Sequence, residues 1–154
     1  VVRTAAAAAG NVVGFFFPLL SDRLGRRFAI FSSFLVAAFG TALYAVSDGY
    51  LPLVFAGVML AGAGSTGSGI LIMVVIPGES APPHLRATAR GFNAAVGEMI
   101  GAGAMPVAIG LAADLYGLAI LPWVLLVVVA LIFLVTLGLG ETAPRLVARK
   151  ALRE

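Results

Sequence analysis

The 154-residue sequence contains no cysteine and very little charge. Without cysteine, the chain can form neither disulfide bonds nor thiolate metal sites. Only 11% of its residues are charged and 61% are hydrophobic, whereas a soluble domain carries about 25% charged residues. So few charges could not cover a water-exposed surface, and the apolar residues occur in long runs rather than at amphipathic spacing. The composition therefore favours an integral membrane protein over a soluble protein with an unusually apolar core.

Motifs for catalysis and cofactor binding are also missing from the sequence. It has no Ser-His-Asp set, no metal-ligand cluster and no phosphate-binding loop, so we expect no enzymatic activity, no metal and no cofactor. Gly62, Gly64 and Gly67 match the G-x-G-x-x-G pattern, but they lie inside a hydrophobic run rather than after a strand. His84 lies in a charged connection and is expected to be exposed.

Several stretches are apolar enough to cross a bilayer, which requires about 20 residues of helix. The predicted spans are residues 4–20, 28–47, 52–76, 89–112 and 118–139, followed by a tail at residues 141–154. Helices are the only solution for an open chain, because lipid offers the backbone no hydrogen-bond partners. We predict an all-α, polytopic transmembrane helix bundle with five spans. The chain opens at Val1 within an apolar stretch, so we expect a fragment that lacks its N-terminus.

The basic residues are distributed unevenly over the connections between these spans. Nine of the ten lysine and arginine residues fall at 22–27, at 79–90 or in the tail, and only Arg3 falls on the other side. Positive residues mark the cytoplasmic face, so we expect a cytoplasmic C-terminus in a multi-pass protein of the cell membrane, a bacterial inner membrane. The net charge of +3 is thereby explained without a nucleic-acid partner.

The predicted spans differ in polarity. The second and fifth are apolar nearly all round, and we expect them to face lipid. The first, third and fourth carry many small residues, and Gly97 and Gly101 have the four-residue spacing typical of close helix contacts. These helices either pack tightly or also form the flexible wall of a polar cavity. The candidate cavity-lining residues, each of which could instead make an interhelical hydrogen bond, are Asn11, Ser65, Thr66 and Ser68.

Glu98 is the only ionisable residue well inside a predicted span. An ionised carboxylate in lipid costs at least a few kcal/mol, so such a residue normally faces a cavity or a partner. A desolvated carboxylic acid can bind and release protons near neutral pH. We therefore predict that Glu98 couples proton movement or contacts solute, with Asn93, one turn nearer the cytoplasm, as the second candidate. The alternative is a partly hydrated Glu98 that is hydrogen-bonded to a neighbouring helix.

The connection at residues 21–27 reads Ser-Asp-Arg-Leu-Gly-Arg-Arg. Its glycine tolerates the positive φ of a tight turn, and its arginines can form bidentate pairs with carboxylates. Between two spans on the positive side, this segment resembles the signature loop of the major facilitator superfamily, although the family's leading glycine falls at Pro18. The resemblance implies that this loop braces the cytoplasmic gate. The loop residues concerned are Asp22, Arg23, Gly25, Arg26 and Arg27.

Two further features are similar to this superfamily. Glu79 and Arg86 match the E-x6-R pattern of the next cytoplasmic loop, and the segment 141–145 resembles the P-E-T motif after the last helix. The resemblance implies a cytoplasmic ion network of Glu79, Arg86 and Glu141, in which the acids pair with Arg26, Arg27 or Arg86.

The resemblance also implies a place in the fold and a function. Val58 stands where an N-terminal half would have an arginine, which favours the C-terminal half, helices 8–12 of twelve. Val74 replaces the tryptophan of sugar porters, which argues against a sugar. We expect alternating-access transport of a small organic solute, by proton-coupled symport or by proton-driven efflux of drugs or metabolites. A non-transporting membrane scaffold subunit is the alternative of another class. The expected partners are the lipid bilayer, the solute, protons and the missing N-terminal half.

Overall fold

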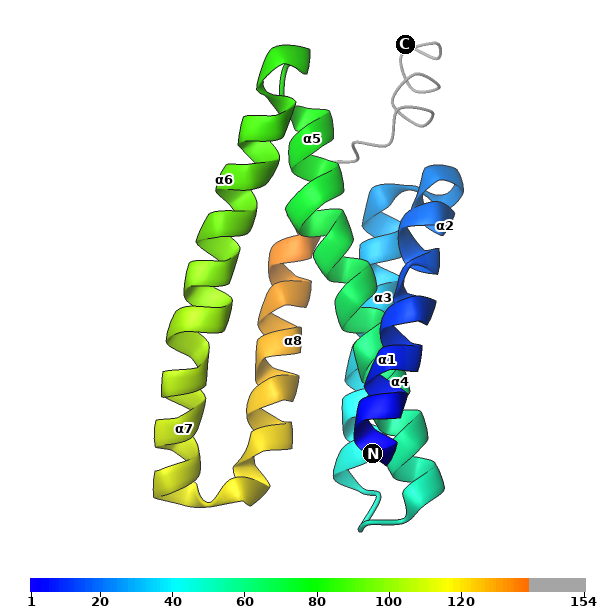
Figure 1. Cartoon of the computed structure of the whole chain (residues 1–154), viewed down its shortest axis with the longest axis vertical. Coiled ribbons are helices and arrows are strands. Elements are labelled where there is room, and N and C mark those ends of the chain that lie inside the picture. The colour runs from blue at the N-terminus through cyan, green and yellow to red at the C-terminus, as the bar shows by residue number, and fades with distance from the viewer. Residues whose placement is uncertain (139–154) are drawn as a thin grey trace.

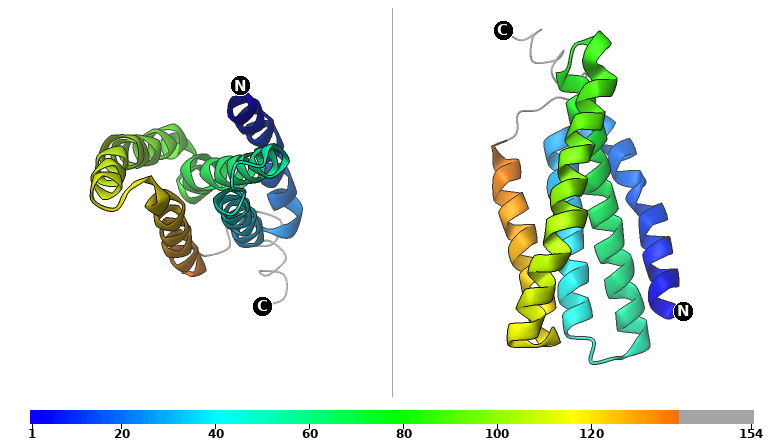
Figure 2. Two further views of the ribbon diagram at one scale, coloured as in Figure 1. Left: turned by 90° about the horizontal axis from the view of Figure 1, so that it is seen from below. Right: turned by 60° about the vertical axis from the view of Figure 1, so that its left-hand side comes forward.

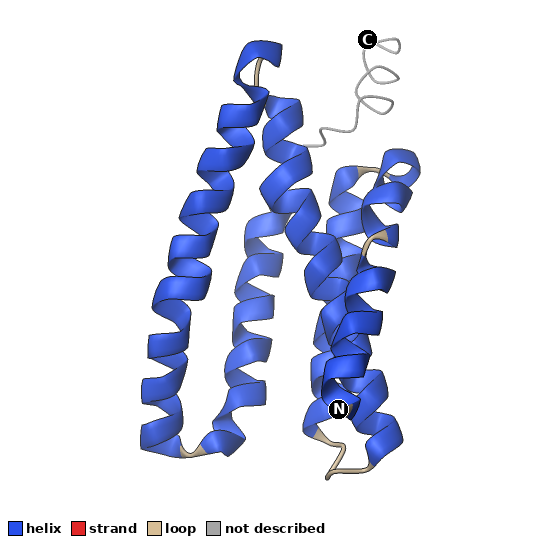
Figure 3. Ribbon diagram, in the orientation of Figure 1, coloured by secondary structure: helices blue, strands red, loops and turns tan. Residues whose placement is uncertain are grey.

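The computed structural model describes residues 1–138, and this part of the chain consists of helices joined by short loops (Figure 3). The helices line up end to end into five rods, which run up and down the long axis of the bundle (Figure 1). In chain order the elements are α1 (Val2–Gly14), α2 (Phe16–Leu24), α3 (Arg26–Ala45), α4 (Leu51–Ile70), a π-helical segment (Leu71–Val75), α5 (Ile76–Ser80), a 3-10 turn (Pro83–Leu85), α6 (Arg86–Glu98), a second π-helical segment (Met99–Ala104), α7 (Met105–Tyr116), a 3-10 turn (Leu118–Ile120) and α8 (Leu121–Leu137).

Each predicted span has a rod in the structure. Four rods are long and apolar enough to cross a membrane, and they comprise Val2–Leu24, Arg26–Ala45, Leu51–Ser80 and Pro83–Tyr116. The fifth rod, α8, is an apolar helix of 17 described residues. The third and fourth rods each end four residues beyond the predicted ends at 76 and 112, at Ser80 and Tyr116. Apolar runs place the centre of a span better than its ends, because helical hydrogen bonds continue through polar residues.

The second rod, α3, which its composition predicted to face lipid, is buried on one side and exposes large apolar side chains, Phe28, Leu35 and Phe39, elsewhere. It packs against α2, α4 and α8, and its buried face includes Ala29, Ile30 and Ala37. This face also buries the hydroxyls of Ser33 and Thr41, which donate to carbonyls of their own helix at 2.8 and 2.9 Å and so keep a hydrogen-bond partner. An all-apolar stretch has no period to reveal its buried side.

Glycines let α4 approach α1 and α3 until the backbones touch. A Cβ atom at Gly64 would lie 2.2 Å from the carbonyl oxygen of Ser33 in α3. On the other side, a Cβ atom at Gly10 of α1 would lie 2.3 Å from the carbonyl oxygen of Met59. These three helices therefore form a closely packed unit in which no side chain larger than hydrogen fits at the contacts.

The spacing of Gly97 and Gly101 does not produce the close backbone contact that it predicted. Gly97 approaches only the side chain of Met73, and around Gly101 no atom of the described chain lies within contact range of an added Cβ. No residue of the α6–α7 rod is buried by the rest of the described chain. The rod stands off from α4, so its small residues have no described helix to meet.

Two rods are interrupted by π-helical turns, and each turn comes shortly before a proline. Leu71–Val75 precedes Pro77, and Met99–Ala104 precedes Pro106. Proline lacks an N–H group, and its ring clashes with the carbonyl four residues earlier, so the preceding turn widens to relieve the clash. The breaks give each rod two parts that can differ in direction.

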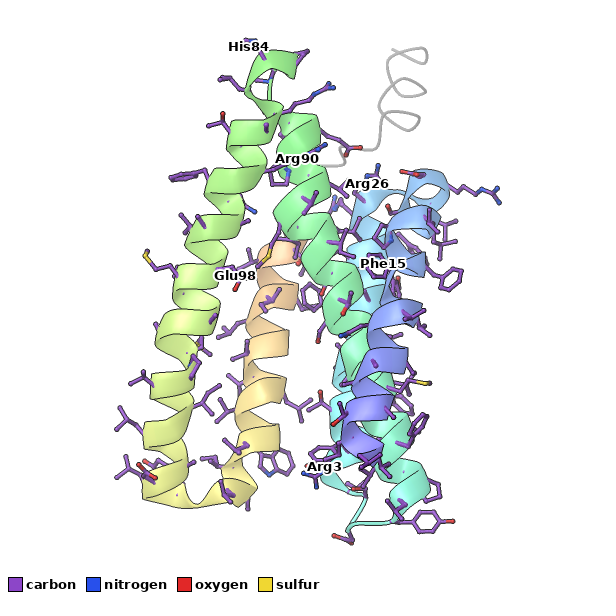
Figure 4. All side chains as sticks on the ribbon, in the orientation of Figure 1. Arg3, Phe15, Arg26, His84, Arg90 and Glu98 are labelled. Carbon is purple, nitrogen blue, oxygen red and sulfur yellow. The ribbon has the colours of Figure 1, made fainter. Side chains whose placement is uncertain are left out.

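The charged connections gather at one end of the bundle. The α2–α3 and α5–α6 junctions lie at the end where α8 finishes, opposite the N-terminus (Figures 1 and 2). Arg26, His84 and Arg90 are at this end, whereas Arg3 is at the other, where its guanidinium stacks at 5.5 Å over the ring of Tyr44 (Figure 4).

Candidate functional site

The junction between α2 and α3 is a single-residue turn at Gly25. This glycine has φ 101° and ψ 154°, which confirms the positive φ predicted for it. Its N–H donates to the carbonyl of Ser21 at 3.0 Å, and its own carbonyl accepts from Ala29 at 3.2 Å. The turn therefore ends one helix, starts the next and sets the first residue of α3, Arg26, beside the last turn of α2.

Arg26 is the centre of the charged end, and its side chain is only 6% exposed. Its Nε and Nη2 atoms donate to the two carboxylate oxygens of Glu79 in α5, at 3.1 and 2.7 Å. Nη2 also lies 2.7 Å from the carboxylate of Asp22, one turn earlier. Glu79 is 20% exposed and Asp22 is 58% exposed. A bidentate, charge-assisted pair of this kind joins α3 to α5 with defined geometry.

Ser21 completes the surroundings of Arg26, although its sequence position had indicated no role. It is fully buried, its hydroxyl accepts from Nη1 of Arg26, and it donates to the carbonyl of Pro18 at 2.6 Å. A buried guanidinium needs partners for its N–H groups, and the serine directly before Asp22 supplies one. The adjacency of this serine to the loop motif was the only sequence signal.

The other loop arginines do not share this cluster. Arg27 turns to the fifth rod, where its Nη2 donates to the carbonyl of Leu137 at 2.9 Å. The last carbonyls of a helix lack partners within the helix, so Arg27 satisfies the end of α8. Arg23 is exposed and, among residues 1–138, has no ion-pair partner within 4.0 Å.

The expected ion network is assembled only in part by the described residues. Of the pairings expected for Glu79, the structure has the one with Arg26. Arg86 is exposed, and residues 1–138 place no carboxylate within 4.0 Å of it. Arg90, which sequence reasoning missed, instead lies against α5, where a Cβ atom at Gly78 would be 2.2 Å from its Nε. Glu141 lies outside the described residues.

The small polar residues of the predicted cavity are mostly engaged between or within helices. Thr66 of α4 donates to the side-chain oxygen of Asn11 of α1 at 2.9 Å. Ser68 donates to the carbonyl of Gly64 in its own helix at 2.9 Å. Ser65 is exposed and lines a cavity of about 260 Å³ between α1, α3 and α4.

A larger hollow, of about 690 Å³, is lined by residues of α1 and α2. Its wall is apolar apart from Asp22 and Arg23, and it is lined besides by Val13, Phe16, Phe17, Leu19 and Leu20. A solute site needs a few convergent polar groups, and apart from Asp22 and Arg23 at the charged end this wall has none. We therefore assign it to lipid or helix packing and not to the solute.

Asn93 and Glu98, the two candidates of the fourth rod, have different surroundings. The amide nitrogen of Asn93 donates to the main-chain carbonyl of Ile72, within the π-helical segment of the third rod, at 3.0 Å. Glu98 lies about midway along its rod, on the side toward α8 (Figure 4). It is exposed and has no hydrogen-bond or ion-pair partner among the described residues.

A bundle of apolar helical rods, with all but one of the basic residues of the described chain at one end (Figure 4), is typical of a polytopic membrane protein. The comparison with protein families gives the same class and a finer assignment: the model of the Major Facilitator Superfamily matches residues 2–154, so the chain belongs to this superfamily of membrane transporters. Searches of curated proteins and of solved structures gave no significant match.

Proposed function

We propose that this chain is the C-terminal half, helices 8–12, of a secondary active transporter that moves a small organic solute together with protons. Superfamily membership supports membrane transport in general. Members bind solute near the middle of the membrane between two halves, which rock to give alternating access. The partner half, the proton coupling and the direction of transport are parts of this proposal.

The observation that carries the proton coupling is the position of Glu98. It is a carboxyl side chain without an ion-pair or hydrogen-bond partner among residues 1–138, midway along a helical rod of 34 residues, Pro83–Tyr116, that is apolar enough to span a bilayer (Figure 4). A carboxylate there is costly unless a cation, a donor or a proton neutralises it. Proton uptake removes this cost reversibly, so the residue suits a carrier that must cross between loaded and empty states.

The charged end supports the alternating-access part of the proposal. The contact of Arg26 with Glu79 and Asp22 joins the α2–α3 turn to the end of the third rod. We propose that this contact is a cytoplasmic latch that closes when the transporter opens outward and breaks in each cycle. Glu141, which follows α8 in the sequence, is the proposed further acid of this latch.

The test uses the full-length parent transporter, purified and reconstituted into vesicles with an imposed pH gradient. Glu98→Gln should abolish solute accumulation driven by the gradient, because the amide cannot take up a proton. Solute exchange without a gradient should continue, since the glutamine preserves size and hydrogen bonding. Asp114→Asn is the matched control: it lies in the same rod, near the end away from the charged junctions, and this variant should accumulate solute as the wild type does.

Three outcomes would change the proposal. Undiminished gradient-driven uptake by Glu98→Gln would remove this residue from proton coupling. Solute expulsion against proton entry in the wild type would show the efflux antiporter instead. An absence of solute flux in both directions, with the protein correctly folded, would favour the scaffold subunit.

A further inference from the structure

The π-helical segment of the third rod leaves one main-chain carbonyl without a backbone donor. The N–H of Ile76 donates to the carbonyl of Leu71, five residues earlier. In an α-helix that N–H would have served the carbonyl of Ile72. The π register would instead assign Ile72 to residue 77, which is proline and has no N–H. The carbonyl of Ile72 therefore has a backbone donor in neither the α-helical nor the π-helical register.

Asn93 of the neighbouring rod fills this vacancy with its side-chain amide, at 3.0 Å from the carbonyl oxygen of Ile72. The second break has the same register, because Met105 donates to Ile100 and residue 106 is proline. Its orphaned carbonyl is that of Gly101, to which no side chain of residues 1–138 donates. The cap is thus a specific feature of the first break and does not accompany every proline.

The capped break lies directly below the charged end. Glu79 follows Pro77 by two residues in the five-residue helix α5. Gly78 lies between Pro77 and Glu79, and the side chain of Arg90 from α6 packs against it. Ile76 of α5 packs on the buried cluster of α3, and α6 adds one contact at the break and one beyond it, so both neighbours contribute to the direction of α5 and to the place of the Glu79 carboxylate.

We propose that Asn93 is a positioning residue of the cytoplasmic latch: by capping the Ile72 carbonyl that Pro77 orphans, it sets the direction in which α5 presents Glu79 to Arg26. This inference rests on the proposed role of the latch in transport. It makes Asn93 neither a solute contact nor a proton carrier. Lipid cannot replace the lost donor, so without the amide the break must relax and α5 must turn with it.

The test measures solute transport by the full-length transporter in vesicles. Asn93→Ala should lower the maximal rate about three- to tenfold, the effect of one interhelical hydrogen bond to an otherwise orphaned group. KM should stay within about twofold, because no solute contact is lost. In a Glu79→Gln background, Asn93→Ala should cost nothing further, since Asn93 acts through Glu79.

A suppressor provides the decisive comparison. Pro77→Ala restores an N–H at residue 77, which can serve the Ile72 carbonyl, so Asn93→Ala should have no effect in that background. Pro106→Ala is the matched control: it removes the other proline of the same register, supplies nothing to Ile72, and should leave the loss unchanged. Where Asn93→Ala alone fails to fold, the folded yields of these two double variants, by size-exclusion chromatography in detergent, give the same comparison.

The proposal is overturned by a raised KM at unchanged maximal rate, by an equal loss in the Pro77→Ala background, or by wild-type activity of Asn93→Ala. Each of these results leaves wild-type transport and the Glu98→Gln result untouched, so the proposed function would stand. Failure of the wild type to transport would count against the proposed function and not against the cap, for which the folded yields remain diagnostic.

Discussion

Loss of Glu79 should open the charged end far more than loss of Asp22, although both carboxylates bind the same guanidinium. The reason is burial: the side chain of Arg26 is 6% exposed and that of Glu79 is 20% exposed, whereas Asp22 is 58% exposed. Removing one partner of a buried pair costs about 3–5 kcal/mol because the other charge remains buried. An exposed pair contributes about 0–1 kcal/mol.

The contacts of Arg26 narrow the expected cost of each substitution. After Glu79→Gln, Arg26 keeps Asp22 at 2.7 Å and the hydroxyl of Ser21, and the glutamine can still accept one hydrogen bond. We therefore expect a cost of about 2 kcal/mol, below the range for a fully buried pair, which is a factor of roughly 30 in the closed-to-open ratio. Asp22→Asn should cost less than about 1 kcal/mol, a factor of about five at most.

The assay is a distance measurement across the latch. The chain has no cysteine, so spin labels can be attached at Leu24→Cys and Ser80→Cys in a parent cleared of other reactive cysteines. Both positions are exposed: Leu24 ends α2, directly before the turn that leads to Arg26, and Ser80 ends α5, directly after Glu79. Glu79→Gln should raise the population at long distance about 30-fold relative to the closed population, and Asp22→Asn should raise it fivefold or less. Equal shifts in the two variants would refute the argument from burial, because it would mean that both pairs behave as surface pairs.

Two further predictions concern glycines. Gly64→Ala should destabilise the protein by about 1–3 kcal/mol, since its Cβ would meet the Ser33 backbone at 2.2 Å. Gly69→Ala, with open space around it, is the control and should be neutral or slightly stabilising. Thermal unfolding in detergent, followed by size exclusion, compares the two variants, and equal melting temperatures would contradict the close packing at Gly64. Gly25→Ala forces an L-residue to φ 101° and should lower the yield of folded protein; an unchanged yield would mean that the turn adopts another conformation.

Features that depend on local chemistry could be predicted from the sequence. Long apolar runs predicted the helical rods, because an open chain in lipid can satisfy its backbone only as a helix. Gly25 predicted the turn, because few other residues adopt a positive φ. The likeness to two superfamily motifs, the signature loop and the E-x6-R pattern, directed attention to Arg26 and Glu79, which are separated by 53 positions and form an ion pair.

What sequence reasoning missed depends on which helices become neighbours. The buried side of α3 could not be predicted because apolar residues lie all round the helix and its buried face also carries the hydroxyls of Ser33 and Thr41, so only packing distinguishes one face from another. Arg86 matched a pattern and is exposed, whereas Arg90, one turn later, packs on Gly78. Asn93 was predicted as a proton-coupling or solute residue, and its bond to the carbonyl of Ile72 was missed. Pro77 indicates that a carbonyl of the preceding turn lacks a donor, but the sequence does not show which side chain reaches it.

The described helices are joined by two kinds of contact, backbone contacts at glycines and contacts through side chains. α1, α3 and α4 meet through glycines, backbone against backbone, and such contacts have little freedom because no side chain can change rotamer to absorb a shift. Beyond the glycine contacts, the third rod is held by side chains: Ile76 packs on the buried cluster of α3, Asn93 of α6 donates to Ile72, and Glu79 pairs with Arg26. The π-helical segment Leu71–Val75 lies where the first kind of contact gives way to the second. If the proposed latch opens by a turn of α5 about this segment, the apolar contacts of Ile76 with α3 must rearrange with it, whereas the glycine contacts of α4 with α1 and α3 can stay in place.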